Sequence, residues 1–102
     1  MILRTWTARA TPEGVAAYRA YFTTVLLPLL RERPGFRGGC LVAEEGGLGT
    51  LTFWDSLDAI RAFAGDDCTT AVVEPEARAV LVDFDRVVRH REVLADARPG
   101  LD

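Results

Sequence analysis

The sequence predicts a small α+β domain in which helices cover one face of a four-stranded antiparallel sheet. Stretches with the two-residue period of strands alternate with stretches that carry apolar residues every three or four positions, as amphipathic helices do. Their order is strand, helix, strand, strand, helices, strand. The length of 102 residues suits one domain. We place that domain at residues 1–94 and expect a flexible tail at residues 95–102.

The first strand is expected over residues 2–9, where side chains of β-favouring types alternate in direction. Arg4 and Trp6 lie on one side of this strand, while Leu3 and Thr5 lie on the other. The strand therefore brings a cation and an aromatic ring to the same face.

A long helix follows and is predicted to end near Glu32. Thr11 suits the N-cap, and Pro12 suits the first turn, where its missing N–H is harmless. Pro28 removes a hydrogen bond to the carbonyl of Thr24 and should kink the last turn. The expected apolar face consists of Val15, Tyr18, Phe22, Val25, Leu26, Leu29 and Leu30.

The middle of the chain predicts a hairpin. Residues 36–44 and 49–54 read as strands, and the turn between them contains Glu45-Gly46-Gly47. Gly38 and Gly39 fit a β-bulge or a close approach by another backbone.

Helical stretches and a strand complete the domain. Ser56 suits the cap of a short helix that ends at Gly65. A further stretch spans about residues 74–82, with Pro75 near its start, and the last strand spans residues 85–94. The short helix is expected to face inward with Leu57, Ile60, Phe63 and Ala64. This order is the ferredoxin-like βαββαβ arrangement.

Several of these strands are apolar on both sides. The third strand carries Leu51 and Phe53 on one side and Trp54 on the other, and the last carries Val87 and Val88 on opposite sides. Side chains of this size left in water would form a patch that soluble monomers seldom tolerate. We therefore expect a homodimer in which two copies meet sheet to sheet, forming a dimeric α/β barrel.

Composition excludes several partners. The net charge is −3, and the clustered basic surface that nucleic acid and anionic membranes select is missing. No apolar run approaches the roughly 20 residues of a membrane span, and the N-terminus lacks the apolar core of a signal peptide, so we expect a cytoplasmic protein. Cys40 and Cys68 are expected to be unpaired small hydrophobes. No close pair of ligands indicates a metal site.

The only histidine, His90, lies in the last predicted strand. It is a candidate catalytic base or hydrogen-bond donor, because histidine changes charge near neutral pH without help. The alternative is a structural histidine bonded to Glu92 or to the backbone.

Four other side chains are candidates for a substrate pocket. Trp54 offers apolar surface and one N–H donor to an aromatic ligand, or else belongs to the core. Arg4 could pair with an anionic substrate, or it could extend to solvent or pair across the dimer. Trp6, on the face of Arg4, and Phe22, on the apolar face of the helix, are expected to add substrate-binding surface.

Three motifs stand in a characteristic order within residues 2–94: Pro34-Gly35-Phe36-Arg37-Gly38, Thr52-Phe53-Trp54-Asp55-Ser56 and Val88-Arg89-His90-Arg91-Glu92-Val93. Together they resemble the antibiotic biosynthesis monooxygenase-like family of dimeric α+β barrel proteins. The resemblance implies a homodimer with a pocket between each sheet and its helices. It also implies a reaction that needs neither metal nor flavin, since some members oxidise phenolic polyketides with O₂ and the ionised substrate supplies the electrons.

The sequence departs from that family at two positions around the matching tryptophan, Trp54. Quinone-forming members carry an asparagine four positions before this tryptophan and a tyrosine six positions after it, where this chain has Thr50 and Ile60. Haem-degrading relatives use a histidine on the helix after the third strand. This chain has none there, so haem cleavage is not expected.

Three functions are left open by the sequence. The first is a cofactor-independent monooxygenase for a small aromatic or polyketide-like substrate, with His90 as base or donor, Trp54 as pocket wall and Arg4 as anion clamp. The second is a non-catalytic dimer that binds a small ligand or serves as a stress or accessory protein. The third is an isomerase or another proton-transfer enzyme. An RNA-binding module is disfavoured, because the acidic charge and the lack of paired strand aromatics leave no platform for bases.

Overall fold

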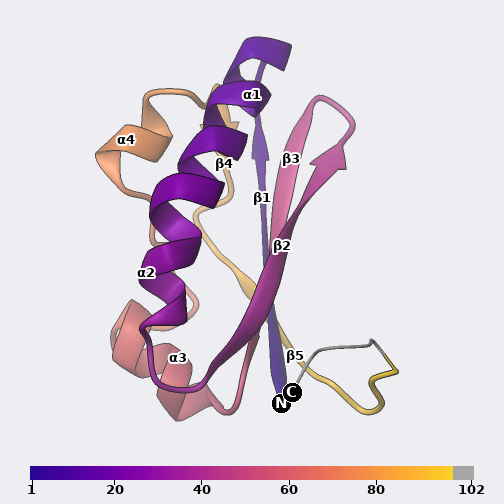
Figure 1. The fold of residues 1–102 in the computed structure, drawn as a ribbon, viewed down its shortest axis with the longest axis vertical. Coiled ribbons are helices and arrows are strands. Elements are labelled where there is room, and N and C mark those ends of the chain that lie inside the picture. The colour runs from indigo at the N-terminus through magenta and orange to yellow at the C-terminus, as the bar shows by residue number, and fades with distance from the viewer. Residues whose placement is uncertain (98–102) are drawn as a thin grey trace.

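The computed structural model describes residues 1–97 and has the predicted α+β architecture (Figure 1). The strands are β1 (Ile2–Arg9), β2 (Phe36–Glu44), β3 (Gly47–Trp54), β4 (Asp83–Phe84) and β5 (Arg89–Glu92). The helical segments are α1 (Pro12–Tyr21), η1 (Phe22–Leu26), α2 (Leu27–Arg31), α3 (Leu57–Ala64) and α4 (Pro75–Arg78). Residues 98–102 of the expected tail lie outside the described residues.

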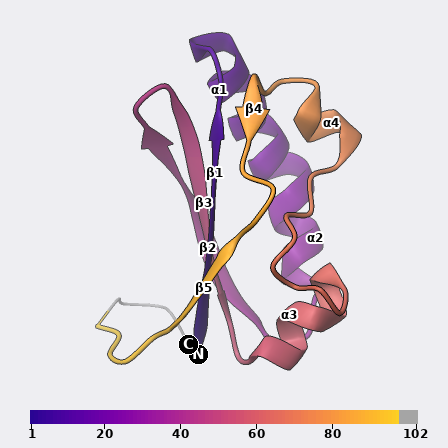
Figure 2. The same ribbon diagram turned by 180° about the vertical axis from the view of Figure 1, so that it is seen from behind.

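The sheet has the strand order of a ferredoxin-like fold. Strand β1 is central, β3 and then β2 lie on one side of it, and β4 and β5 both pair with its other side. All these pairs are antiparallel. Figures 1 and 2 show the helices on one face of the sheet, while the described chain leaves the other face uncovered.

The last strand, expected at residues 85–94, is a strand only over β5, and a separate short strand, β4, lies just before the expected range. Between them the chain leaves β1 and pairs with the loop after α3. The amide of Ala71 donates to the Arg86 carbonyl, and the amide of Val88 donates to the Thr69 carbonyl, both at 2.8 Å. This detour turns Val88 into the core and leaves Val87 61% exposed.

The long helix is continuous to Arg31 but contains a π-helical turn, η1, at residues 22–26. Pro28 lies two residues after this turn and cannot donate a backbone hydrogen bond. Thr23 and Thr24 donate their hydroxyls to carbonyls of the preceding turn, a contact that bends helices. A π-turn adds one residue to the helical repeat. The predicted apolar face is therefore shifted, and Leu29 is 53% exposed while Leu30 is buried.

Two other expectations about the helices need correction. The stretch predicted at residues 74–82 is helical only over α4, and Val82 is exposed. Leu57 was expected to face inward but is exposed at the first position of α3. Ser56 still caps this helix, since its hydroxyl accepts from the amide of Ala59 at 3.1 Å.

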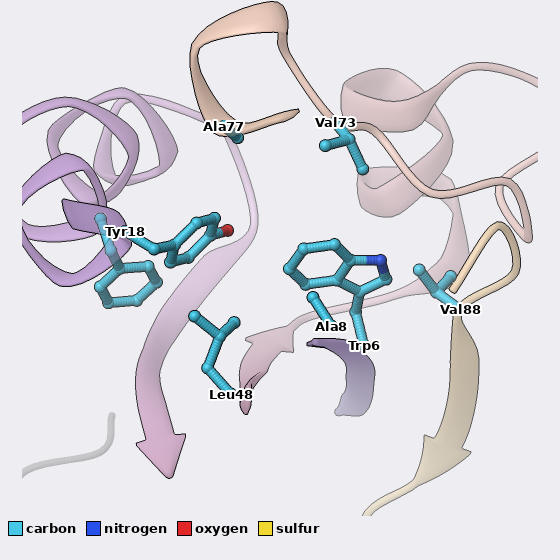
Figure 3. Close-up of a cluster of buried hydrophobic side chains, with 8 residues drawn as sticks. Trp6, Ala8, Tyr18, Leu48, Val73, Ala77 and Val88 are labelled. Atoms are coloured by element: carbon cyan, nitrogen blue, oxygen red, sulfur yellow. The ribbon is translucent and has the colours of Figure 1, made fainter. Parts of the chain in front are cut away.

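The core lies between the sheet and the helices and forms two clusters of buried side chains. Most of the larger cluster is drawn in Figure 3, and its members are Trp6, Ala8, Tyr18, Phe22, Leu48, Val73, Ala77 and Val88. The second cluster consists of Leu30, Trp54, Ile60 and Cys68. Trp6 belongs to the first cluster and Trp54 to the second, and both line the space between the clusters, which therefore has aromatic walls.

Two glycines are required by the local backbone or by a close contact. Gly38 has φ = +124° at the bulge where the register of β2 and β3 shifts, as the sequence predicted for this pair of glycines. Gly14 lies in α1, where an added Cβ would overlap the carbonyl oxygen of Val80. The approach of the chain after α4 to helix α1 therefore depends on a residue without a side chain.

Candidate functional site

An inner cavity of about 60 Å³ lies between the sheet and the long helix. Its walls include Arg4, Trp6, Tyr18, Phe22, Trp54 and Phe63. These side chains come from β1, α1, η1, β3 and α3, so the cavity joins all the layers of the fold. Four of the five residues predicted as site residues thus line one space, and His90 is the exception.

Arg4 is the only charged side chain of this cavity, and it is 6% exposed. Its position follows from the two-residue period of β1, which directs Arg4 and Trp6 toward the helices. The Nη1 group donates to the carbonyl of Cys68 at 2.6 Å and contacts Nε2 of His90 at 2.8 Å. The Nη2 group donates more weakly to the carbonyl of Thr70 at 3.4 Å.

The charge of Arg4 has no carboxylate partner among residues 1–97, since its hydrogen-bond acceptors are two carbonyls and an imidazole. Burial lowers the pKa of Arg4, while the neighbouring Cys68 opposes that change. A guanidinium has five donors, and within residues 1–97 the Nε–H of Arg4 has no hydrogen-bond partner. Every completely enclosed polar side-chain atom of the described chain is hydrogen bonded, so this donor must open onto accessible space. The cavity therefore presents an unpaired cationic edge.

His90 lies beside the site, behind Arg4. It pairs with Arg4 across the β1–β5 ladder, so both side chains point to the same face. Because a guanidinium only donates, Nε2 of His90 must accept, which requires a neutral ring protonated at Nδ1. Burial, and then the charge of Arg4, lower the pKa of His90. The imidazole is therefore neutral at pH 7 and holds Arg4 in place.

The two tryptophans supply apolar surface to the cavity. Trp54 is completely buried, and its Nε1–H donates to the hydroxyl of Thr52 at 3.0 Å. The Nε1–H of Trp6 donates to the carbonyl of Asp85 at 2.8 Å. Both N–H groups are thus used within the protein. Trp54 also stacks on Phe63, with ring centroids 5.3 Å apart. Phe22, the first residue of η1, is buried and completes the wall.

Tyr18 is a cavity residue that the sequence analysis placed only on the apolar face of the helix. It is 3% exposed, and its ring lies 5.9 Å from that of Trp6. Its hydroxyl makes no hydrogen bond within the described chain. Burial, and then Tyr21, raise the pKa of Tyr18, so the phenol stays protonated and can donate. A phenol in a helical stripe of leucines and valines was the one available signal for this role.

An outer cavity of about 230 Å³ adjoins the inner one and shares Tyr18, Leu26, Leu30, Phe63 and Val72 with it. Its remaining walls come from the long helix and from residues 73–77, and include Arg33, Glu74 and Glu76. The Phe63 ring lies 5.9 Å from the Arg4 guanidinium and 5.8 Å from that of Arg33. Phe63 thus separates a buried cation from one nearer the surface.

Two further observations concern the part of the chain that the structure describes. No group of three or more His, Cys, Asp or Glu side chains is placed to hold a metal ion, and Cys40 and Cys68 are both unpaired. None of the helices is long and apolar enough to cross a lipid bilayer.

The sheet order and the enclosed cavity define a ferredoxin-like α+β domain with an aromatic, cationic space between its layers. No protein-family model matches the chain, and no curated protein matches it significantly. Solved structures do match. A Streptomyces coelicolor monooxygenase from the gene ActVA-Orf6, in complex with nanaomycin D, is 17% identical with a TM-score of 0.67, covering 97% of this chain and 92% of that one.

Two other structures match over similar lengths. A putative antibiotic biosynthesis monooxygenase from Caulobacter crescentus is 18% identical with a TM-score of 0.68, covering 92% of this chain and 90% of that one. A haem-degrading protein from Mycobacterium tuberculosis, solved haem-free, is 20% identical with a TM-score of 0.60, covering 96% and 100%. The chain therefore has the fold of antibiotic biosynthesis monooxygenase-like proteins, and the resemblance predicted from its motifs is confirmed for the fold.

Proposed function

We propose that this protein is a cofactor-independent monooxygenase that oxidises a small, acidic aromatic or polyketide-like molecule. The observation that carries the proposal is the buried Arg4, whose charge has no carboxylate partner within residues 1–97 and whose unpaired edge opens onto an aromatic cavity. A buried cation without a counter-ion is costly. An anionic ligand would supply that counter-ion.

In the proposed reaction the protein provides charge and a dry space, and the substrate provides the electrons. Arg4 stabilises the phenolate, and we assign His90, behind Arg4, as the base that takes the phenol proton when Arg4 releases its Nε2. The phenolate donates electrons to O₂, a carbon–oxygen bond forms, and the resulting peroxide takes the proton back from His90 to give a hydroperoxide. Loss of water from this hydroperoxide leaves a quinone, so one oxygen atom of O₂ enters the product and the other leaves as water.

The size of the site suggests how a ligand would be held. Sites for small molecules usually enclose roughly 300–1,000 Å³, which is more than the inner cavity offers. A substrate ring would therefore extend from the inner cavity into the outer one. Trp6, Phe22 and Trp54 would contact its inner part, and Phe63 would have to move aside.

A homodimer in the cytoplasm is part of the same proposal. The uncovered face of the sheet carries Leu3, Thr5 and Leu51, as the strand register requires. A second copy packed on this face would cover them and complete the barrel that the family resemblance implies.

A non-catalytic ligand-binding dimer is the second candidate function, and two observations favour it. His90 does not line the cavity, and its Nε2 is engaged by Arg4. Thr50 and Ile60 occupy the positions where quinone-forming members have an asparagine and a tyrosine. Such a protein would bind the same acidic aromatic class without turnover.

Oxygen uptake with a panel of dihydroxynaphthalenes tests the proposal. We expect uptake with at least one member, and a loss of roughly a hundredfold in rate for His90→Ala, as for other general bases. Arg31→Ala is the control, because Arg31 is an exposed residue of α2 that lines neither cavity and lies outside the sheet. Equal rates for wild type and His90→Ala would remove His90 from the mechanism. If calorimetry detects binding of these compounds but no oxygen is taken up, the result would favour the non-catalytic function.

A further inference from the structure

The hydroxyl of Tyr18 is the polar group that the long helix contributes to the cavity. Tyr18 lies on the last full turn of α1 before η1, and its ring packs against Trp6 and, at 5.6 Å, against Tyr21. Figure 3 shows the hydroxyl oxygen directed toward the space bounded by Trp6, Val73 and Ala77. The same side chain lines both the inner and the outer cavity. The hydroxyl thus lies where the two cavities meet.

This hydroxyl is unpaired although Tyr18 is almost completely buried. A buried tyrosine ordinarily finds a hydrogen-bond partner for its hydroxyl. Tyr18 makes ring contacts but no hydrogen bond within residues 1–97. All completely enclosed polar side-chain atoms of the described chain are hydrogen bonded, so the Tyr18 hydroxyl oxygen is not completely enclosed. The oxygen must therefore be accessible through the cavity, where only a ligand or water can reach it.

The described lining of the cavity consequently has unpaired donors on different elements: the Nε edge of Arg4 on β1, the hydroxyl of Tyr18 on α1 and the hydroxyl of Thr50 on β3. Between Arg4 and Tyr18 lies the indole of Trp6, which follows Arg4 by two positions on the strand and touches the ring of Tyr18. An aromatic ligand lying along Trp6 would meet a cation at one end and a neutral donor at the other.

We propose that Tyr18 is a specificity-determining residue and that the ligand is an aromatic acid carrying a second, neutral hydrogen-bond acceptor such as a carbonyl group. This inference rests on the proposed function, because it assigns the class of molecule that occupies the same site. The anionic oxygen of the ligand binds Arg4, and its carbonyl oxygen accepts from Tyr18. An analogue without that carbonyl leaves the hydroxyl unpaired in the complex, and it binds more weakly.

Matched pairs of benzoates test this assignment. The acetyl and isopropyl groups have similar size, but only the acetyl group accepts a hydrogen bond. We would measure, by calorimetry, the dissociation constants of 3- and 4-acetylbenzoate and of 3- and 4-isopropylbenzoate. The wild-type protein should prefer at least one acetyl compound over its isopropyl partner by roughly three- to tenfold, the range expected for one neutral hydrogen bond.

Two variants make the test specific. Tyr18→Phe should abolish the preference while retaining affinity for isopropylbenzoate. Thr24→Val is the control, because it removes an exposed hydroxyl from the same long helix at a position that lines neither cavity; it should keep the wild-type preference. Thermal unfolding gives a second readout. Since the Tyr18 hydroxyl has no protein partner, Tyr18→Phe should not lower the melting temperature, and a clear fall would show a structural role instead.

The outcomes separate this inference from the proposed function. A wild-type protein that binds the benzoates without preferring acetyl, or a preference that survives in Tyr18→Phe, would overturn the role of Tyr18 and leave anion binding intact. A wild-type protein that binds none of the four benzoates would overturn the inference, and the proposed function falls with it only if no dihydroxynaphthalene supports oxygen uptake.

Discussion

Arg4 and His90 form a pair in which each residue determines the state of the other. The guanidinium requires an acceptor, so the imidazole stays neutral, and the neutral imidazole keeps the guanidinium turned toward the cavity. Protonating His90 would place two cations 2.8 Å apart in a partly buried site. The pair is therefore sensitive to pH.

Stability should fall as the pH drops below the ordinary histidine pKa of 6.5, because of this pair. The pKa of His90 is lower in the folded protein than its ordinary value of 6.5, so the unfolded chain binds the proton more readily. The stabilisation is complete above pH 6.5 and is lost as the pH falls toward the folded-state pKa. His90→Gln, which can still accept from Arg4, should lose less melting temperature over this range than the wild type. A parallel decline in both proteins would contradict the assignment.

At the scale of elements, the geometry of the site depends on where segments approach each other closely. Strand β1 supplies Arg4 and Trp6, and the long helix supplies Tyr18 and Phe22 from the turns on either side of the junction between α1 and η1. Residues 79–82 pack against α1 at Gly14, where the carbonyl oxygen of Val80 lies close to the helix. A substitution at one of these contacts should lower the stability of the fold more than it lowers the affinity for a ligand.

Gly14→Ala should destabilise the protein, although the same exchange in an open helix is stabilising by about 1 kcal/mol. The added Cβ would overlap the Val80 carbonyl oxygen, which is backbone and cannot rotate away. We expect a loss of about 1–3 kcal/mol, as for other overpacked sites, measured by urea unfolding. Ala17→Gly, at an exposed position of the same helix, should cost only about 0.5–1 kcal/mol. A more stable Gly14→Ala protein would show that the two segments can separate freely.

The sequence could predict these elements because their signals are local. The alternation over residues 2–9 correctly put Arg4 and Trp6 on one face, and Thr11, Ser56 and the glycines at 46 and 65 marked turns and caps. The exposure of Leu29 was missed, because a π-turn depends on how Pro28 and two threonines compete for backbone groups. The shorter last strand was missed as well, since it depends on pairing of the preceding residues with the loop at residues 69–71.

The site itself was only half predictable. Trp54, Trp6, Phe22 and Arg4 were recognised by residue type and face, but the contact between Arg4 and His90 joins positions 86 apart and depends on strand register. The unpaired hydroxyl of Tyr18 could not be predicted either. Whether a buried phenol finds a partner depends on the three-dimensional packing of three elements around it.

At the scale of the whole molecule, one face of the sheet is covered and the other is not. The chain measures 34 × 31 × 23 Å, with a radius of gyration of 13.3 Å, close to the ~13 Å expected for a chain of about 100 residues. Figure 2 shows the sheet with helices on one side only. On the uncovered side, Leu51 lies opposite Thr5 of β1 and Cys40 of β2. This is the surface on which we propose that a second copy packs.

Sedimentation should therefore detect a homodimer at micromolar concentration. Leu51→Arg would place a charge in the middle of the proposed interface and should shift the protein to monomers. Leu29→Arg is the matched control, because Leu29 is an exposed leucine on the helical side and its replacement should leave the dimer intact. A wild-type protein that sediments as a compact monomer would exclude the barrel.

The proposed function depends most on the charge of Arg4, which should bind the anionic group of the ligand. Calorimetric titration with an anion and its neutral analogue tests this directly. Wild-type protein should bind 4-isopropylbenzoate roughly ten- to a hundredfold more tightly than 4-isopropylbenzamide, as expected for hydrogen bonds to a charged group. This preference should vanish in Arg4→Met and persist in Arg31→Met, whose arginine is exposed on α2 and lines neither cavity. Equal affinity for the two compounds in the wild type, or a preference that survives in Arg4→Met, would contradict the account.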